Sequence, residues 1–314
     1  MSGAKLHIVL NAGAGHQSGA GMRSEIEAAL DGSGRDYEML VAESPDRLGE
    51  VAARAVESAL ASQGIVVAAG GDGTINTVAA ATLASGCPFG VLPSGTFNYF
   101  ARAHGLPVGG MAESVRALLD GQPRPVRVGL INEQIFLVNA SLGMYPQLLQ
   151  DREAWKKRFG RSRPVALAAA LATFVRSHRS LRLSLDMEGK SPRQITASTV
   201  FVGNNRLQLE QIGIDEASAV DAGRLVVLTL KPASLWAMLA LIVRGALGTL
   251  GDADEVTAAA TSALTIAPAH RLARRRIKVA FDGEVSWQRA PLAIGVSPRP
   301  LMLVMPPPEA PQAA

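Results

Sequence analysis

The 314-residue sequence has a single cysteine, Cys87, and only five histidines. One cysteine excludes a disulfide framework within the chain and favours a reducing compartment. The histidines are scattered, and no two of them have the spacing of a metal-ligand pair. We therefore expect neither a thiol site nor a histidine-based metal site.

Aromatic residues make up only 4% of the chain, and no apolar run reaches the ~20 residues that a membrane span needs. The longest runs are 165–175 and 235–250, and Arg244 interrupts the second. The apolar run near the N-terminus is too short for a signal peptide. Few aromatics also argue against a stacking surface for nucleic acid. We expect a cytoplasmic protein that binds no nucleic acid and meets a membrane only from its surface.

The content of hydrophobic residues, 48%, and of charged residues, 18%, indicates a globular protein. The length favours two domains or one large one. The net charge of +4 is a mild excess. Such an excess suits a partner that carries phosphates, namely a nucleotide or an anionic membrane surface.

The first third of the chain alternates short apolar strands with amphipathic helices. This alternation predicts right-handed crossovers and a doubly wound parallel sheet, so residues 1–125 are expected to form a nucleotide-binding α/β domain. The expected strands are 6–10, 37–42, 65–69 and 89–92, and the expected helices are 19–30, 46–61 and a third that carries Ile75 and Leu83 on one face.

The chain changes character near residues 121–128, and mostly strand-like runs follow. They predict a second, largely antiparallel β-sandwich domain over residues 126–305, whereas 306–314 is a disordered tail by composition. The expected strands are a pair around the turn at 132–134, then 181–187, 194–204, 224–230, 263–268 and 276–285, with helices at 151–159, 164–177 and 232–249.

Three polar, glycine-bearing loops follow strands of the first domain, at residues 11–19, 70–74 and 93–98. In a parallel sheet such loops lie along one edge, and each of these precedes a helix whose first N–H groups can bind an anion. The candidate phosphate ligands are Asn11, Gly13, Gly15, Gly70, Gly71, Gly73, Thr74, Ser94, Gly95, Thr96 and Asn98.

Asp72 is the one carboxylate among these glycines, in the stretch GGDGT. A carboxylate beside phosphates repels them unless a divalent cation lies between, so Asp72 is a candidate Mg²⁺ ligand. For any single loop, tight packing explains the glycines about as well as function, but three loops together favour function. Neither the P-loop nor the dinucleotide-binding glycine pattern is present.

The stretch VVAAGGDGTINTVAAA (66–81), followed by FGVLPSGTFNYFARAHGLP (89–107), resembles the catalytic domain of the diacylglycerol kinase family. That family includes soluble bacterial diacylglycerol kinases and sphingosine kinases. Further segments recur in the family's order, so the resemblance extends over about residues 5 to 305. They are NAGAG (11–15), NASLGMYP (139–146), VFVGNNR (200–206), DAGRL (221–225) and VAFDGEV (279–285).

The resemblance implies an ATP- and Mg²⁺-dependent kinase that transfers the γ-phosphate to a hydroxyl of a neutral lipid such as diacylglycerol. The glycine loops would hold the nucleotide, Asp72 would face Mg²⁺, and Glu284 would be the general base. By itself, Asp282–Gly283 predicts only a hairpin turn, and the resemblance alone favours a catalytic Glu284.

The sequence departs from the family pattern at three positions. Tyr99, Arg127 and Ala222 stand where many members have aspartate. Asp221, beside Ala222, is the substitute candidate for a structural metal ligand. These departures keep open a catalytically silent nucleotide- or lipid-binding protein, and a kinase of a small soluble molecule such as NAD is a second alternative.

Two basic clusters, 152–163 and 271–278, are candidate contacts with anionic lipid headgroups. For 152–163 this interpretation and an ordinary solvated face are about equally supported, and for 271–278 the solvated face is favoured. The expected partner is a lipid substrate met at an anionic membrane surface, and a homodimer is left open.

Overall fold

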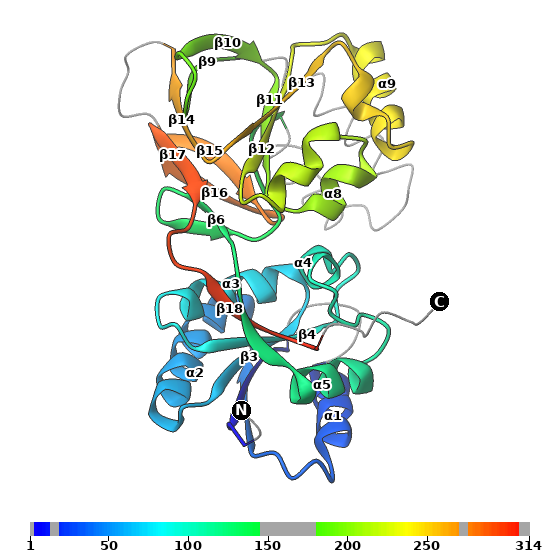
Figure 1. The fold of residues 1–314 in the computed structure, drawn as a ribbon, viewed down its shortest axis with the longest axis vertical. Helices are drawn as coiled ribbons and strands as arrows, with labels where there is room; N and C mark the ends of the chain where they lie inside the picture. The colour runs from blue at the N-terminus through cyan, green and yellow to red at the C-terminus, as the bar shows by residue number, and fades with distance from the viewer. Residues whose placement is uncertain (1–2, 13–18, 145–179, 270–275, 308–314) are drawn as a thin grey trace. The chain divides into compact units, whose positions relative to one another are not determined.

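The computed structural model describes residues 3–12, 19–144, 180–269 and 276–307 (Figure 1). The chain divides into two compact units. The first comprises Met1–Val128 and Ser297–Ala314, and the second comprises Gly129–Val296. The predicted boundary after residue 125 lies close to the first of these divisions.

The first unit is built on a six-stranded sheet with the order β2-β1-β3-β4-β18-β5. The neighbours from β2 to β18 pair in parallel, and only β5 is antiparallel to its neighbour, so the predicted parallel sheet is confirmed. The strands are β1 (Leu6–Asn11), β2 (Tyr37–Ala42), β3 (Ile65–Gly70), β4 (Pro88–Pro93), β5 (Gln122–Val126) and β18 (Leu301–Met305).

Helices cover both faces of this sheet. Figure 1 shows α1 (Gly19–Leu30) and α2 (Leu48–Ser62) on opposite sides of it. In α1, Met22, Ile26 and Leu30 recur every four residues and are buried against the strands together with Val115 and Leu118 of α5 (Met111–Asp120). The other helical elements are η1 (Pro45–Arg47), α3 (Asp72–Leu83) and α4 (Tyr99–Ala103).

The C-terminal strand corrects the expected end of the second domain. We expected that domain to reach residue 305, but β18 pairs with β4 and β5 in the first sheet. Its residues Leu301, Leu303 and Val304 are buried there. The physical reason is that a short apolar strand satisfies its hydrogen bonds in any sheet with an open position, so its sequence does not identify the sheet.

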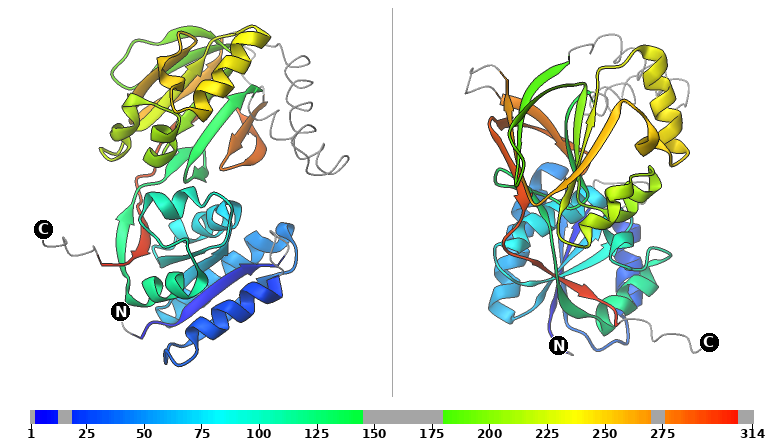
Figure 2. Two further views of the ribbon diagram at one scale, coloured as in Figure 1. Left: turned by 90° about the vertical axis from the view of Figure 1, so that its right-hand side faces the viewer. Right: turned by 45° about the horizontal axis from the view of Figure 1, so that its top comes forward.

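The second unit contains two six-stranded sheets, with the orders β10-β9-β14-β17-β6-β7 and β13-β12-β11-β8-β15-β16 (Figure 2). One core takes buried residues from both sheets, for example Phe136 and Leu185 from the first and Leu142 and Val227 from the second. The predicted antiparallel domain is confirmed. The strands are β6 (Gly129–Ile131), β7 (Gln134–Phe136), β8 (Asn139–Gly143), β9 (Leu181–Met187), β10 (Arg193–Ala197), β11 (Thr199–Gly203), β12 (Leu225–Leu230), β13 (Val256–Thr261), β14 (Ala263–Pro268), β15 (Arg276–Phe281), β16 (Glu284–Arg289) and β17 (Leu292–Val296).

Two predicted strands of this unit are in fact pairs. The run 194–204 divides at Ser198 into β10 and β11, which belong to different sheets. The run 276–285 divides at Asp282 and Gly283 into β15 and β16, which form a hairpin. The predicted helices 151–159 and 164–177 and the basic cluster 152–163 lie outside the described residues.

The predicted helix 232–249 is present as α9 (Leu235–Ala246). Its buried residues Met238 and Leu241 pack with Met144 and Ala253. The remaining helical elements are α8 (Arg206–Gln211), η2 (Asp215–Val220) and η3 (Leu250–Asp252). Within the ranges that the structure describes, no helix has both the length and the apolar content to span a bilayer.

Candidate active site

The structure brings together the ends of three strands of the first sheet. Asn11, the last residue of β1, donates through Nδ2 to Thr74 Oγ1 in α3 at 3.4 Å. Ser94, just after β4, donates its backbone N–H to the carbonyl of Gly70 at 3.0 Å. The three predicted loops therefore start from one edge of the sheet. Gly13 and Gly15, both in the first loop, lie outside the described residues.

The glycines of the second and third loops allow their backbones to approach closely. A Cβ added to Gly95 would lie 2.9 Å from the Cα of Gly71, and one added to Gly70 would lie 2.7 Å from the Cβ of Thr74. Both distances are shorter than real Cβ contacts. These three glycines therefore have a packing role, whatever else they do.

The other predicted phosphate ligands lie in the same two loops. Gly73 and Thr74 belong to the first turn of α3, where helical N–H groups lack partners within the helix. Ser94 and Thr96 are exposed in the turn between β4 and α4. Both positions suit contact with an anion at the N-terminus of α3.

Asp72 is the first residue of α3, and its carboxylate is fixed by the third loop. Its Oδ2 accepts a hydrogen bond from the backbone N–H of Asn98 at 3.1 Å. The side chain of Asn98 in turn holds Gly95, accepting from its N–H and donating to its carbonyl, both at 2.9 Å. Asn98 is buried and has a φ of +50°, a conformation that asparagine tolerates.

The second oxygen of Asp72, Oδ1, is buried and has no hydrogen-bond partner in the described part of the chain. Burial raises the pKa of the Asp72 carboxyl group, and the backbone N–H groups of Asn98, Phe100 and Tyr99 partly oppose that rise. An unsatisfied buried carboxylate oxygen is costly, so it calls for an explanation such as an ion.

A magnesium ion fits this oxygen. The described residues contain no group of three or more histidine, cysteine, aspartate or glutamate side chains that could hold a metal. Mg²⁺ needs no such group, because it is commonly bound by one or two carboxylates together with phosphate oxygens and water. Asp72 Oδ1 is thus a suitable single protein ligand for a metal that enters with a nucleotide.

Tyr99, at one of the positions where the family often has aspartate, forms an aromatic pair beside this site. Its ring stacks on that of Phe97, with the centroids 5.6 Å apart and the planes 7° from parallel. Phe97 is exposed. An aromatic pair thus occupies the end of the third loop and the start of α4, where many members of the family have an aspartate.

The predicted general base, Glu284, belongs to the second unit and is the first residue of β16. Its side chain is exposed, and the protein around it raises the pKa of its carboxyl group through desolvation. A raised pKa makes a carboxylate a stronger base.

The sequence analysis missed Asp282, the residue that fixes this turn. Its carboxylate accepts hydrogen bonds from three consecutive backbone N–H groups, those of Leu137 at 2.6 Å, Val138 at 2.9 Å and Asn139 at 3.0 Å. Its own N–H donates to the carbonyl of Asn139 at 3.0 Å. The only signal was Asp-Gly itself, which we took for an ordinary hairpin turn. Asp282 instead ties the turn before Glu284 to the strand connection before β8.

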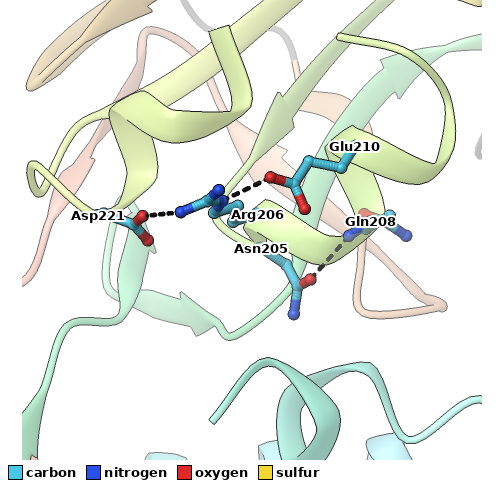
Figure 3. A network of polar contacts seen from close by, with 5 residues as sticks. All are labelled: Asn205, Arg206, Gln208, Glu210 and Asp221. Carbon is cyan, nitrogen blue, oxygen red and sulfur yellow. Dashed lines mark hydrogen bonds and ion pairs between the residues drawn. The ribbon is translucent and has the colours of Figure 1, made fainter. Parts of the chain in front are cut away.

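Asp221, the substitute candidate for a structural metal ligand, has an arginine as its partner in the described residues (Figure 3). Its carboxylate forms an ion pair with Arg206, which also pairs with Glu210 at 2.6 Å. Asn205 caps the same helix, α8, by accepting from the N–H of Gln208 at 3.0 Å. One guanidinium group thus pairs with two carboxylates, those of Asp221 and Glu210, and the metal role of Asp221 stays a prediction.

The model of the diacylglycerol kinase catalytic domain matches residues 5–131. The resemblance drawn from the sequence is thereby confirmed for the part of the chain that holds Asp72 and the three loops.

Two curated relatives each match about a third of the chain. A diacylglycerol kinase of Bacillus subtilis is 38% identical over 105 residues, 33% of this chain and 35% of the relative. A protein of Pseudomonas aeruginosa named "Probable lipid kinase YegS-like" is 46% identical over 96 residues, 29% of this chain and 31% of the relative. The aligned part of the chain therefore spans about a third of each relative.

The solved structures show the fold of the whole chain. A diacylglycerol kinase from Bacillus anthracis matches with a TM-score of 0.67 and 18% identity, over 97% of both chains. At that identity the match shows the fold alone.

Proposed function

We propose that this protein is an ATP- and Mg²⁺-dependent lipid kinase that transfers the γ-phosphate to a hydroxyl of a neutral lipid such as diacylglycerol. The observation that carries the proposal is the buried, unsatisfied Oδ1 of Asp72 at the N-terminus of α3. It lies within the residues that match the diacylglycerol kinase catalytic domain model.

The first unit supplies the phosphate site. The first turn of α3 offers backbone N–H groups to the phosphates, and the glycines around Asp72 leave room for a close approach. Asp72 would hold Mg²⁺ through Oδ1, while Asn98 fixes its Oδ2. The metal would supply neutralisation of the negative charge on the transferred phosphoryl group.

The second unit supplies the proton acceptor. Glu284 takes the proton from the acceptor hydroxyl, and its raised pKa suits that task. The hydrogen bonds of Asp282 to residues 137–139 hold the turn from which Glu284 projects. Asp282 is therefore a positioning residue.

Two alternatives make different predictions. A kinase of a small soluble molecule would use the same phosphate site, and would leave the label in a water-soluble product. A silent nucleotide-binding protein is suggested by Tyr99, which stands where many members of the family have aspartate and stacks on Phe97. It would bind ATP and transfer nothing.

The test is transfer of labelled γ-phosphate from Mg-ATP into a total lipid extract. Glu284→Ala is compared with Glu133→Ala, which removes another exposed glutamate from a hairpin turn of the same unit. We expect a labelled lipid with the parent and with Glu133→Ala but not with Glu284→Ala. Label in a soluble product supports the first alternative, and ATP binding without transfer supports the second.

A further inference from the structure

An open cavity of about 600 Å³ in the second unit lies between the turn that joins β6 to β7 and the open end of the β15–β16 hairpin. Two arginines, a tryptophan and three amides contribute to its lining, namely Arg276, Arg289, Trp287, Asn132, Gln134 and Gln288. The predicted base Glu284 is not among the lining residues. Arg289 follows Glu284 by five residues in β16, which is about 17 Å at ~3.4 Å per residue.

The two arginines of the cavity repel each other. Arg276 and Arg289 are directly opposite in the β15–β16 ladder. Side chains in such positions have Cβ atoms ~5 Å apart, and like charges there destabilise the pairing of the strands. Within the ranges that the structure describes, neither guanidinium group has an ion pair, although Glu133 lines the same cavity. An anion in the cavity would offset this repulsion.

A network of amide side chains fixes one wall of the cavity. Asn132 donates through Nδ2 to Gln288 Oε1 and to the carbonyl of Arg289, both at 3.2 Å. Gln288 donates through Nε2 to Gln134 Oε1 at 2.6 Å. These hydrogen bonds tie the β6–β7 turn of one sheet to β16 of the other. The Nε2 group of Gln134 has no partner among the described residues, so it is available to a ligand.

Trp287 adds an apolar surface beside the arginines. It is 58% exposed, and the Nζ of its cross-strand neighbour Lys278 lies 5.3 Å from the centre of its ring. Alternation along the strands places Arg276, Lys278, Trp287 and Arg289 on one face of the hairpin. The other residues of this face are Ala280 and Val285, so the hairpin itself supplies no carboxylate there.

The charges indicate which ligand the cavity takes. Guanidinium groups bind phosphate oxygens through paired hydrogen bonds. A phosphate monoester has ~1.5–2 negative charges at pH 7, so a single group of this kind compensates both arginines. A carboxylate fits less well, because it brings one charge and Glu133 already supplies a carboxylate to the lining.

We infer that this cavity binds a soluble phosphate monoester. Arg276 and Arg289 hold the phosphate group, and Trp287 contacts the carbon part of the ligand. The inference goes beyond the proposed function and does not depend on it, because the cavity shares no residue with the glycine loops, Asp72 or Glu284.

The experiment follows the indole N–H signal of Trp287 by NMR while phenyl phosphate is added to the full chain without ATP. Trp287→Phe identifies this signal among those of the three tryptophans. The test variant is Arg276→Gln with Arg289→Gln. The matched control, Arg182→Gln with Arg193→Gln, removes two exposed strand arginines of the same unit that do not line the cavity.

We expect a saturable shift of the signal in the parent and in the control. Binding by the test variant should be at least about tenfold weaker, because the phosphate loses its charged hydrogen-bond donors. An ordinary solvated pair of arginines would give no saturable shift in the parent.

Arg289→Glu tests the repulsion separately. A glutamate opposite Arg276 forms a cross-strand ion pair, so the thermal midpoint without ligand should equal or exceed that of the parent. The same variant should lose the response to phenyl phosphate. A midpoint well below that of the parent would give Arg289 a structural partner and would overturn the argument from repulsion.

Three further outcomes would overturn the inference. They are a parent signal that does not shift, a test variant that binds as tightly as the parent, and a shift that requires a lipid headgroup. The last is examined with vesicles of phosphatidylcholine and phosphatidic acid, and a shift with these vesicles but not with phenyl phosphate would decide against a soluble ligand. Failure of the kinase proposal leaves all these results unchanged, because no phosphoryl transfer is measured.

Discussion

Each unit of the molecule has an Asp-Gly dipeptide among its candidate functional residues, Asp72–Gly73 in the first and Asp282–Gly283 in the second. The two aspartates differ in how their carboxylates are hydrogen-bonded. In Asp72 one oxygen accepts a hydrogen bond from the N–H of Asn98, and the other oxygen is buried without a partner in the described residues. In Asp282 both oxygens accept hydrogen bonds, from three backbone N–H groups in all.

The difference separates a chemical role from a structural one. A carboxylate whose two oxygens both accept backbone hydrogen bonds contributes to folding and offers fewer lone pairs to a ligand. A buried carboxylate with an unsatisfied oxygen lowers stability, so it is explained by a ligand that arrives later. By this criterion we assign Asp72 to ligand binding, and Asp282 to holding the turn that positions Glu284.

The largest expected effect is that of Asp72→Asn on phosphoryl transfer. An amide cannot hold Mg²⁺ as a carboxylate does, so the rate should fall at least about a hundredfold. The free energy of unfolding at neutral pH should not fall, because the buried charge disappears while an amide oxygen still accepts from Asn98. The measurements are single-turnover transfer and denaturant unfolding.

Asp31→Asn is the matched control, since Asp31 is an exposed aspartate of the same unit. It should change neither the rate nor the stability. Transfer at the parental rate by Asp72→Asn would remove the distinction between the two aspartates.

The reverse pattern is expected for Asp282→Ala. Three N–H groups lose their acceptor, and alanine must adopt the φ of +47°, so unfolding of the second unit should become easier by about 2–4 kcal/mol. Asp282→Asn retains one acceptor oxygen and tolerates positive φ, so it should lose less. Urea unfolding provides the measurement, and equal stability of parent and Asp282→Ala would contradict the structural role.

A third prediction concerns α4, whose N-terminus binds Asp72. His104 follows this helix, and its ring packs edge-on against Phe100 with the centroids 4.7 Å apart. Burial lowers the pKa of His104 from 6.5 to about 4. The folded protein thus holds a neutral imidazole, and the unfolded chain takes up the proton first as the pH falls.

The stability that depends on neutral His104 is therefore complete above the unfolded pKa and is lost between about pH 6.5 and about pH 4. At 1.36 kcal/mol for each pKa unit, the loss reaches about 3 kcal/mol. His104→Phe keeps a ring against Phe100 and does not titrate, so it should lack this part of the acid sensitivity. The measurement is the free energy of unfolding of parent and variant at several pH values. Parallel pH profiles of the two would refute the contribution of His104 to acid sensitivity.

The smallest effect is expected for Asp221→Asn, which extends the comparison to a third aspartate. Its ion pair with Arg206 is solvent-exposed, so the unfolding midpoint should change little and any change should disappear at high salt. Mg²⁺ should affect the parent and the variant equally. A Mg²⁺-dependent rise of the midpoint that the variant lacks would make Asp221 a metal ligand after all.

The sequence predicted what depends on local pattern. The runs that became β1 and β3 are mostly apolar because their strands are buried on both faces, and the repeating apolar positions of α2 predict a helix. The three glycine loops follow from the same alternation, since parallel strands place their ends at one edge.

What the sequence could not give depends on distant partners. Ser198 interrupts a run that looks like one strand, and only the sheets on either side show why β10 and β11 separate. Asp282 follows its partners, residues 137–139, by 143 to 145 positions along the chain. The unsatisfied oxygen of Asp72 is likewise a property of packing, which no motif encodes.

The position of β18 has a consequence for how the protein is made. Residues 301–305 fill the place between β4 and β5, and the ribosome synthesises them after the whole of the second unit. Until they emerge, the nascent first sheet has a missing strand and two unpaired edges, which are prone to wrong pairing. The first sheet is therefore completed only after the whole second unit has been synthesised, and the phosphate loops lack their complete sheet until then.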